Sequence, residues 1–324
     1  MIGRREVITL LGGTAATWPL AARAQRQAMP VVAWLHSTSF KSNESFVAAF
    51  RNGLKEAGFV EGQNVVLEYR WGEGETDRLP ALITDLIARQ VAVIAADTRG
   101  ALALKKARTT IPIVFATSAD PVKLGLVTSL NRPEGNMTGV SFLLTAAVAK
   151  RLDLLRELVP TASEIGYLVN PDNFNNEIEE VKAAARALGL QMLVLNVRSE
   201  RDFDHAFTTL IERRTSALFV GTDPLFLVRR DELVALAARY AIPAIYYLRQ
   251  YPVAGGLISY GTSIEDADRQ RGIYVGRILK GTKPSELPVM QSVRFELVIN
   301  LKTAKTLGLK VPLALQVAAD EVIE

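Results

Sequence analysis

The sequence predicts an α/β protein built from two doubly wound lobes, each with a mostly parallel sheet. Strand-length apolar runs alternate with helical stretches along the chain, which is the order that βαβ units require. The runs are apolar at consecutive positions, as strands covered by helices on both faces must be. The length of 324 residues exceeds what one hydrophobic core usually holds, so two lobes are expected.

The first 24 residues are expected to lie outside this fold. Arg4 and Arg5 precede an apolar stretch over 7–20, and Ala22-Arg23-Ala24 then supplies an Ala-x-Ala cleavage signal. This order is typical of a signal peptide cut after Ala24. The paired arginines resemble a twin-arginine (Tat) export signal, with Sec export as the alternative. No later run of about 20 apolar residues follows, so we expect a soluble protein in the periplasm if the organism is Gram-negative.

The first half of the remaining chain holds strand candidates rich in Val, Ile, Leu and Phe, separated by stretches long enough for helices. In order along the chain, strands are expected over 31–35, 65–69, 91–95 and 112–115, and helices over 44–57, 77–89 and 101–108.

The second half repeats this order, which favours two lobes of the same design. Residues 107–115 match 238–246 at an offset of 131, and Ala57-Gly58 falls on Leu188-Gly189 at the same offset. In this half, strands are expected over 165–169, 192–197, 217–220 and 243–246, and helices over 177–188, 202–213 and 225–239.

Composition and motifs narrow the function. The net charge is +4, from 38 Lys and Arg against 34 Asp and Glu, and the basic residues are spread along the chain, so nucleic acid is not expected as a partner. The chain has no Cys and two His, His36 and His205, which leaves no thiol nucleophile and few ligands for a transition metal. Phosphate-binding, dinucleotide-binding, metalloprotease and nucleophile-elbow motifs are absent. We therefore predict no catalytic residue, no metal and no cofactor. A hydrolase that pairs the strand-end carboxylates Asp97, Asp120 and Asp223 stays an alternative.

A ligand of such a protein is expected where the carboxyl ends of parallel strands meet. Several loops at these ends carry hydroxyl and amide side chains just before a helix, and such helix N-termini suit a carboxylate or another anion. The same residue types are also ordinary helix caps, and the neighbouring aromatic residues could equally belong to the core. The candidate ligand-binding residues are Ser37, Thr38, Phe40, Thr98, Ser118, Asn170, Asn173, Asp223 and Tyr246.

An amino-acid-like ligand gives these residues distinct roles. We expect the hydroxyls of Ser37, Thr38, Thr98 and Ser118 to hold a carboxylate and Asp223 to face an ammonium group. Phe40 and Tyr246 would then sandwich an apolar or aromatic side chain.

Five segments carry a family resemblance. Residues 111–139, with Asn131-Arg132-Pro133-Glu134-Gly135-Asn136 near their end, resemble the ABC transporter substrate-binding proteins of the family that includes tryptophan- and tyrosine-binding components. The resemblance continues over 255–261, 278–284, 295–302 and 319–324 and covers the whole chain. Where relatives commonly have a small turn such as Gly-Thr-Pro, this chain has Asp97-Thr98-Arg99-Gly100, so the identity of the ligand should not be copied from them.

The resemblance implies the type I periplasmic binding protein fold, in which crossover segments join the two lobes. Carried onto this sequence, 136–142 and 258–263 would be crossovers, helix 264–279 would return to the first lobe, and residues from 295 onward would join the second. Lobe 1 is therefore expected to comprise 25–138 with 263–286, and lobe 2 to comprise 139–262 with 287–324, after the signal peptide 1–24.

The resemblance also implies binding without chemistry. A small-molecule ligand would favour closure of the lobes about the crossovers, membrane permease subunits would recognise the closed form, and a separate subunit would hydrolyse ATP. We expect a monomer. A secreted sensor partner for a membrane kinase and a hydrolase on the same fold stay open. A lac-repressor-type regulator is disfavoured because residues 1–24 cannot supply a DNA-reading helix-turn-helix.

Overall fold

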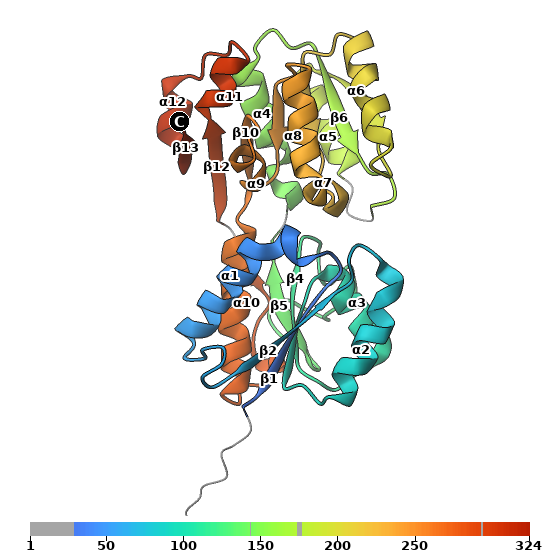
Figure 1. Cartoon of the computed structure of the whole chain (residues 1–324), viewed down its shortest axis with the longest axis vertical. Coiled ribbons are helices and arrows are strands. Elements are labelled where there is room, and N and C mark those ends of the chain that lie inside the picture. The colour runs from blue at the N-terminus through green and yellow to red at the C-terminus, as the bar shows by residue number, and fades with distance from the viewer. Residues whose placement is uncertain (1–28, 143, 174–176, 293) are drawn as a thin grey trace, which may run out of the picture.

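The structure is a computed structural model that describes residues 29–142, 144–173, 177–292 and 294–324. Figure 1 shows two α/β lobes stacked along the long axis of the molecule. The predicted signal peptide, residues 1–24, lies outside the described residues. None of the helices that the structure describes is long and apolar enough to cross a bilayer.

The first lobe is a parallel sheet in the order β11-β5-β4-β3-β1-β2. Alternate residues of its central strand β1 pack into different clusters, Val32 and Trp34 with α1 and α10, and Ala33 and Leu35 with α2 and α3. Helices therefore cover both faces (Figure 1). The strands are β1 (Val31–His36), β2 (Val66–Trp71), β3 (Val93–Ala96), β4 (Ile113–Thr117), β5 (Met137–Ser141) and β11 (Met290–Gln291), and the helices are α1 (Phe40–Glu56), α2 (Leu79–Ala88), α3 (Thr98–Ala107) and α10 (Ile264–Leu279).

The second lobe has the sheet order β13-β12-β10-β9-β8-β6-β7, parallel except where β12 pairs antiparallel with β10. Its strands are β6 (Glu164–Val169), β7 (Gln191–Asn196), β8 (Ala217–Val220), β9 (Ala244–Tyr246), β10 (Ile258–Thr262), β12 (Phe295–Asn300) and β13 (Glu321–Ile323). Its helices are α4 (Val148–Leu158), α5 (Ile178–Ala187), α6 (Asp202–Glu212), α7 (Pro224–Val228), α8 (Arg230–Arg239), α9 (Gln250–Val253), α11 (Leu301–Thr306) and α12 (Leu313–Ala318).

The two sheets share one winding, which confirms the predicted fold class. The order β2-β1-β3-β4-β5 in the first sheet matches β7-β6-β8-β9-β10 in the second. Gly58 and Gly189, which stand at the offset of 131, both follow a helix with a positive φ, at 90° and 70°. Glycine adopts this left-handed conformation without steric cost, so each helix ends in the same way.

Two details differ from the sequence expectation. The expected crossover 136–142 holds β5, which pairs along its length with β4, so residues 139–141 lie in the first sheet together with β11. Periodicity could not separate a strand of the first sheet from a crossover, because both are short apolar runs. The expected helix 225–239 is two helices, because Arg229 between them has φ −99° and ψ 21°, outside the helical range.

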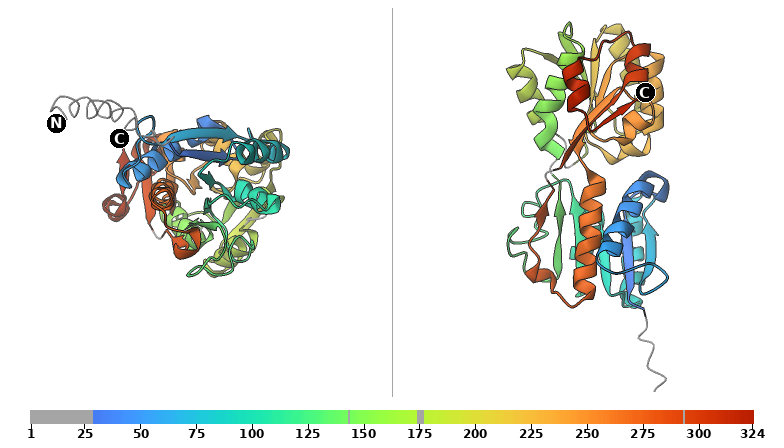
Figure 2. Two further views of the ribbon diagram at one scale, coloured as in Figure 1. Left: turned by 90° about the horizontal axis from the view of Figure 1, so that it is seen from below. Right: turned by 90° about the vertical axis from the view of Figure 1, so that its left-hand side faces the viewer.

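The packing of α10 against α1 brings one end of α10 to the boundary between the lobes (Figure 2). The helices approach so closely that a Cβ on Gly53 would meet the Arg269 carbonyl oxygen at 1.8 Å, and one on Gly272 would meet the Phe50 carbonyl oxygen at 2.2 Å. Glycine at both positions is what allows this approach. The register of α10 at the cleft is therefore set by backbone contact with α1.

Candidate functional site

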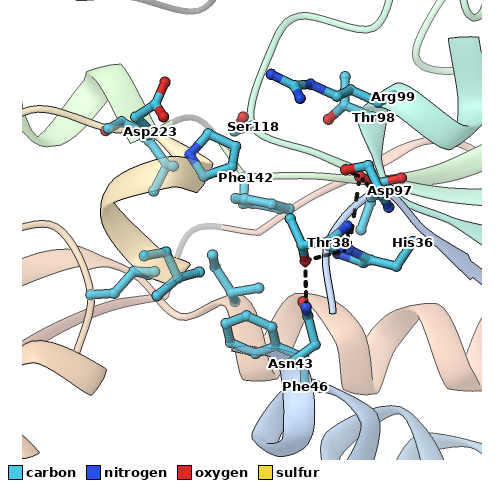
Figure 3. Close-up of a pocket in the computed structure, with 18 of the residues that line it drawn as sticks. His36, Thr38, Asn43, Phe46, Asp97, Thr98, Arg99, Ser118, Phe142 and Asp223 are labelled. Atoms are coloured by element: carbon cyan, nitrogen blue, oxygen red, sulfur yellow. Dashed lines mark hydrogen bonds and ion pairs between the residues drawn. The ribbon is translucent and has the colours of Figure 1, made fainter. Parts of the chain in front are cut away.

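A cavity of about 140 Å³ lies between the two lobes, at the carboxyl ends of β1, β3 and β4 and beside the loops after β8 and β9. This is the position expected for a ligand of doubly wound sheets. Pockets for drug-sized ligands usually measure about 300–1,000 Å³, so this one suits a small solute. Figure 3 shows its polar residues approaching from both sides.

The turn after β1 forms a hydrogen-bonded wall on the side of the first lobe. The Ser37 hydroxyl and backbone N–H both donate to Asp97 Oδ2. The Thr38 N–H donates to His36 Nδ1 at 3.2 Å, and the Asn43 amide donates to Thr38 Oγ1 at 2.6 Å. Because His36 Nδ1 accepts a hydrogen bond, its proton lies on Nε2 in the neutral ring. Burial lowers the pKa of His36, the Asp97 carboxylate opposes this shift, and the Arg271 charge adds to it.

The N-terminus of α3 closes the same wall. Asp97 caps this helix, accepting the Gly100 N–H through Oδ1 at 2.9 Å. The Thr98 hydroxyl donates to Thr117 Oγ1 at 3.1 Å, and Arg99 points across the cavity in Figure 3. The Arg99 guanidinium and the N–H groups of this helix N-terminus are donors for a carboxylate, and the Asp97 carboxylate offsets part of their positive charge.

Two charged residues of α10 lie beneath this wall. Arg271 Nη2 pairs with Asp268 Oδ1 at 2.6 Å, Arg271 Nη1 donates to the Ala96 carbonyl at 3.0 Å, and the guanidinium lies 4.0 Å from the Trp34 ring centroid. Burial raises the pKa of Asp268 to about 7 even though the Arg271 charge lowers it. A carboxyl group with a pKa near neutral pH therefore lines the cavity.

Asp223 is the acidic residue on the side of the second lobe. Its Oδ1 accepts the Leu225 N–H at 2.7 Å and so caps α7, and the carboxylate is buried beside the amide side chains of Asn170 and Asn173. Burial raises the pKa of Asp223, and hydrogen bonds from the Leu225 N–H and the two amides, together with the charge of Arg99, oppose this rise. The Tyr247 hydroxyl donates to the Asp223 carbonyl at 2.8 Å. A buried carboxylate is a site for a cationic donor, because a nearby positive charge compensates for its lost hydration.

A buried ion pair behind Asp223 holds this loop in place. Arg151 Nη2 contacts both carboxylate oxygens of Glu177 at 2.9 and 2.8 Å, and the two side chains are 0% and 1% exposed. Glu177 Oε1 also accepts the Thr222 N–H at 3.1 Å and its hydroxyl at 3.2 Å. The residue before Asp223 is thereby anchored to the core of the second lobe.

Apolar side chains complete the cavity between the two charged ends. They come from both lobes, so a ligand held here would lose water on both sides. They are Phe46, Phe142, Leu144, Leu227, Val228, Tyr247, Leu248 and Ile264.

The structure brings most of the predicted ligand residues together. Ser37, Thr38, Thr98, Ser118, Asn173 and Asp223 line the cavity.

The remaining three predicted residues do not line the cavity. Asn170 Oδ1 accepts the Asp172 N–H within its own loop, and its side chain lies beside the Asp223 carboxylate. Phe40 is 47% exposed and packs edge-on against Trp71 on the surface. Tyr246 is buried against the Tyr251 ring, with centroids 4.5 Å apart, and the adjacent Tyr247 lines the cavity instead. Neighbouring residues of an extended chain point in opposite directions, and the sequence pattern did not show which of the two faced the cleft.

Reasoning from strand-end loops missed the helical side of the cavity. Asn43 and Phe46 come from α1, and Ile264, Asp268 and Arg271 from α10. The three α10 residues stand at i, i+4 and i+7, which is the spacing of one helix face. Two charged residues on an otherwise apolar helix face were the signal in the sequence that could have indicated this part of the cavity. In the described ranges no three His, Cys, Asp or Glu side chains are grouped so that they could hold a metal ion.

The chain is similar to known proteins over most of its length. The sequence model of a family described as ABC transporter substrate binding protein matches residues 32–323. A tyrosine-binding protein of Clostridioides difficile (strain R20291) is 24% identical over 278 residues, which cover 85% of this chain and 79% of the relative.

Solved structures share the fold. A conserved domain protein of Vibrio cholerae O1 biovar El Tor and an ABC domain from Streptococcus pneumoniae in complex with L-Trp each superpose with a TM-score of 0.81. Both are 26% identical to this chain, and each match covers 91% of it and 99% of the other protein.

Proposed function

Because the chain belongs to the family of ABC transporter substrate binding proteins and has the type I periplasmic binding protein fold, we propose that it captures an amino-acid-like solute for import. The solute would be held between the lobes, outside the cytoplasm, and delivered to permease subunits at the membrane surface. Twin-arginine export, cleavage after Ala24 and a monomeric state are part of this proposal.

The observation that carries the proposal is a pair of opposite charges that face the cavity from its two sides. Arg99, at the N-terminus of α3, lies on the first lobe, and the buried carboxylate of Asp223 lies on the second. An α-amino acid carries a carboxylate and an ammonium group on the same carbon, so it can contact both charges at once. Thr98 and Ser118 stand beside Arg99 for the carboxylate (Figure 3).

The apolar wall then receives the side chain of the solute. Phe46, Phe142, Leu227 and Tyr247 offer hydrophobic contact between the charged ends. The names of the relatives, a tyrosine-binding protein and a complex with L-Trp, agree with an amino acid that has a large apolar body.

Closure of the lobes would couple binding to transport. A solute that contacts both lobes favours the closed form, because only differential affinity can shift such an equilibrium. The lobes already touch where Gln250 of α9 donates to Glu265 Oε1 of α10 at 2.7 Å and Ser45 of α1 donates to the same oxygen at 3.1 Å. The permease would recognise the closed shape, and ATP would be hydrolysed by a separate subunit.

A thermal-shift panel of amino acids, small amides and sugars tests the proposal. A solute at a hundredfold excess over its Kd adds about 2.7 kcal/mol to the free energy of unfolding. Asp223→Asn should weaken the binding of an amino acid by about 2–5 kcal/mol, because it leaves the ammonium group without its charge partner. Asp172→Asn, on an exposed carboxylate of the same lobe, is the matched control and should leave the affinity unchanged. The proposal is wrong if no amino acid shifts the transition or if Asp223→Asn binds as the wild type does.

The two alternatives make different predictions. A hydrolase would need paired carboxylates at its substrate, whereas Asp97 caps α3 and Asp120 Oδ1 accepts the Val122 and Lys123 N–H groups. A binding protein returns its solute unchanged after incubation, whereas a hydrolase does not. A sensor would bind the same solute without supporting its uptake by cells.

A further inference from the structure

Asp268 is a buried carboxyl group of the cavity with fewer hydrogen-bond and ion-pair partners than it can accept. It is 3% exposed and lines the cavity from α10. Within the described residues, its ion pair with Arg271 through Oδ1 is its only polar contact with another side chain. An ionised carboxylate can accept about four hydrogen bonds, so this group has spare capacity toward the cavity.

Two other acceptors of this wall are already engaged. Asp97 accepts from Gly100 and Ser37, and Thr38 Oγ1 accepts from Asn43. Asp268 differs from them because its ion-pair partner, Arg271, contacts one of its two oxygens.

Neutralising Arg271 does not by itself account for Asp268. The Arg271 guanidinium also donates to the Ala96 carbonyl and stacks on Trp34, and it engages one oxygen of Asp268. A residue needed only as a counter-ion would be expected below the cavity, whereas Asp268 reaches the cavity surface.

We propose that Asp268 accepts a hydrogen bond from the end of the solute's side chain, so that the preferred solute is an amino acid whose side chain ends in a donor such as a hydroxyl or ring N–H. This inference rests on the proposed function. With the carboxylate near Arg99 and the ammonium group near Asp223, the side chain extends along Phe46 and Ile264, and Ile264 stands one helical turn before Asp268 on α10.

Paired solutes that differ by one donor test this inference. L-tyrosine and L-phenylalanine differ by one hydroxyl, and the ratio of their affinities isolates that group. A site built to hydrogen-bond a solute hydroxyl can reject the analogue that lacks it by far more than tenfold. We expect the wild type to prefer L-tyrosine by about tenfold or more, and Asp268→Ala to bring the ratio close to one.

Two further variants separate the hydrogen bond from a general loss of structure. Asp268→Asn keeps the size and one acceptor oxygen but not the charge, so its ratio should be intermediate. Asp266→Ala removes a carboxylate of the same helix that pairs with Arg269 outside the cavity, and its ratio should equal that of the wild type.

The pH profile of the wild type keeps the test usable if Asp268→Ala does not fold. The ratio should rise from pH 5.5 to pH 8.5, because burial raises the pKa of Asp268 to about 7 and an ionised carboxylate is the stronger acceptor. Other charged groups near this end of the cavity are His36, Asp97, Arg271 and Glu265, with Asp223 and Arg99 at the solute's charged end. Asp268→Asn leaves all of these in place, and its ratio should stay flat with pH.

The outcomes distinguish this inference from the proposed function. If the wild type binds no amino acid, both are overturned. If it binds amino acids but L-tyrosine and L-phenylalanine equally, or if the ratio is the same in the wild type and Asp268→Ala, only the role of Asp268 is overturned.

Discussion

Replacing Glu177 by Gln should destabilise the second lobe and weaken solute binding together. The substitution keeps the shape of the side chain but removes the charge that balances Arg151. Arg151 is 0% exposed, and Glu177 holds it through contacts of 2.9 and 2.8 Å. Water cannot reach the guanidinium to compensate for the lost partner.

The magnitude follows from this burial. Removing one partner of a buried ion pair costs about 3–5 kcal/mol, because the remaining charge stays uncompensated in a medium of low polarity. Native proteins are stable by about 5–15 kcal/mol, so the variant should still fold. The Thr222 N–H and hydroxyl would also face a neutral acceptor in place of a charged one, which loosens the backbone next to Asp223.

Urea denaturation followed by circular dichroism measures the loss of stability, and a solute titration measures the loss of affinity. Glu179→Gln is the matched control, because Glu179 lies two residues further along, is 80% exposed on its side chain and pairs with Lys182 at the surface. Its effect should stay below about 1 kcal/mol. A Glu177→Gln protein as stable as this control would refute the reasoning.

Three more outcomes follow from the contacts described above. Gly272→Ala places a Cβ 2.2 Å from the Phe50 carbonyl oxygen. The cost of overpacking, about 1–3 kcal/mol, should exceed the helix-propensity gain of about 1 kcal/mol, so the variant should be less stable than the wild type. A urea midpoint at or above that of the wild type would contradict this. Burial raises the pKa of Asp268 from its ordinary 3.8 to about 7, so between these pH values the unfolded chain binds fewer protons than the folded protein. The stability of the wild type relative to Asp268→Asn should therefore fall as the pH rises from about 4 to about 7. Calorimetry at several pH values checks the sign. Tyr247→Phe removes the hydroxyl that donates to the Asp223 carbonyl, so it should cost about 1 kcal/mol of stability and weaken solute binding. If the variant binds the solute as tightly as the wild type, this hydrogen bond does not position Asp223.

The predicted elements agree with the structure wherever a local pattern was sufficient. The runs at 31–35 and 217–220 are the interior strands β1 and β8, and the expected helix 202–213 corresponds to α6. Their residues are apolar on both faces or carry a helical period, and no distant contact is needed to recognise either pattern. The same holds for Ser37, Thr98 and Asp223, which the strand-end rule brought to the cavity.

The rest of the site depended on contacts between distant segments. Tyr247 rather than Tyr246 faces the cavity because β9 ends between them, and the change of direction there leaves no trace in residue type. Asp268 and Arg271 reach the cleft because Gly53 and Gly272 allow α10 to approach α1 at backbone distance, across more than 200 residues of sequence.

The sequence by itself determined the alternation of strands and helices, the duplication of the winding and the polar loops at the strand ends, because each of these follows from the order of residue types along the chain. Only the tertiary structure decided which charges meet across the cleft. Arg99 and Asp223 stand on different lobes, and Asp268 stands on a helix that returns to the first lobe from the second. Their proximity depends on the path of the chain between the sheets, and that path is set by long-range packing.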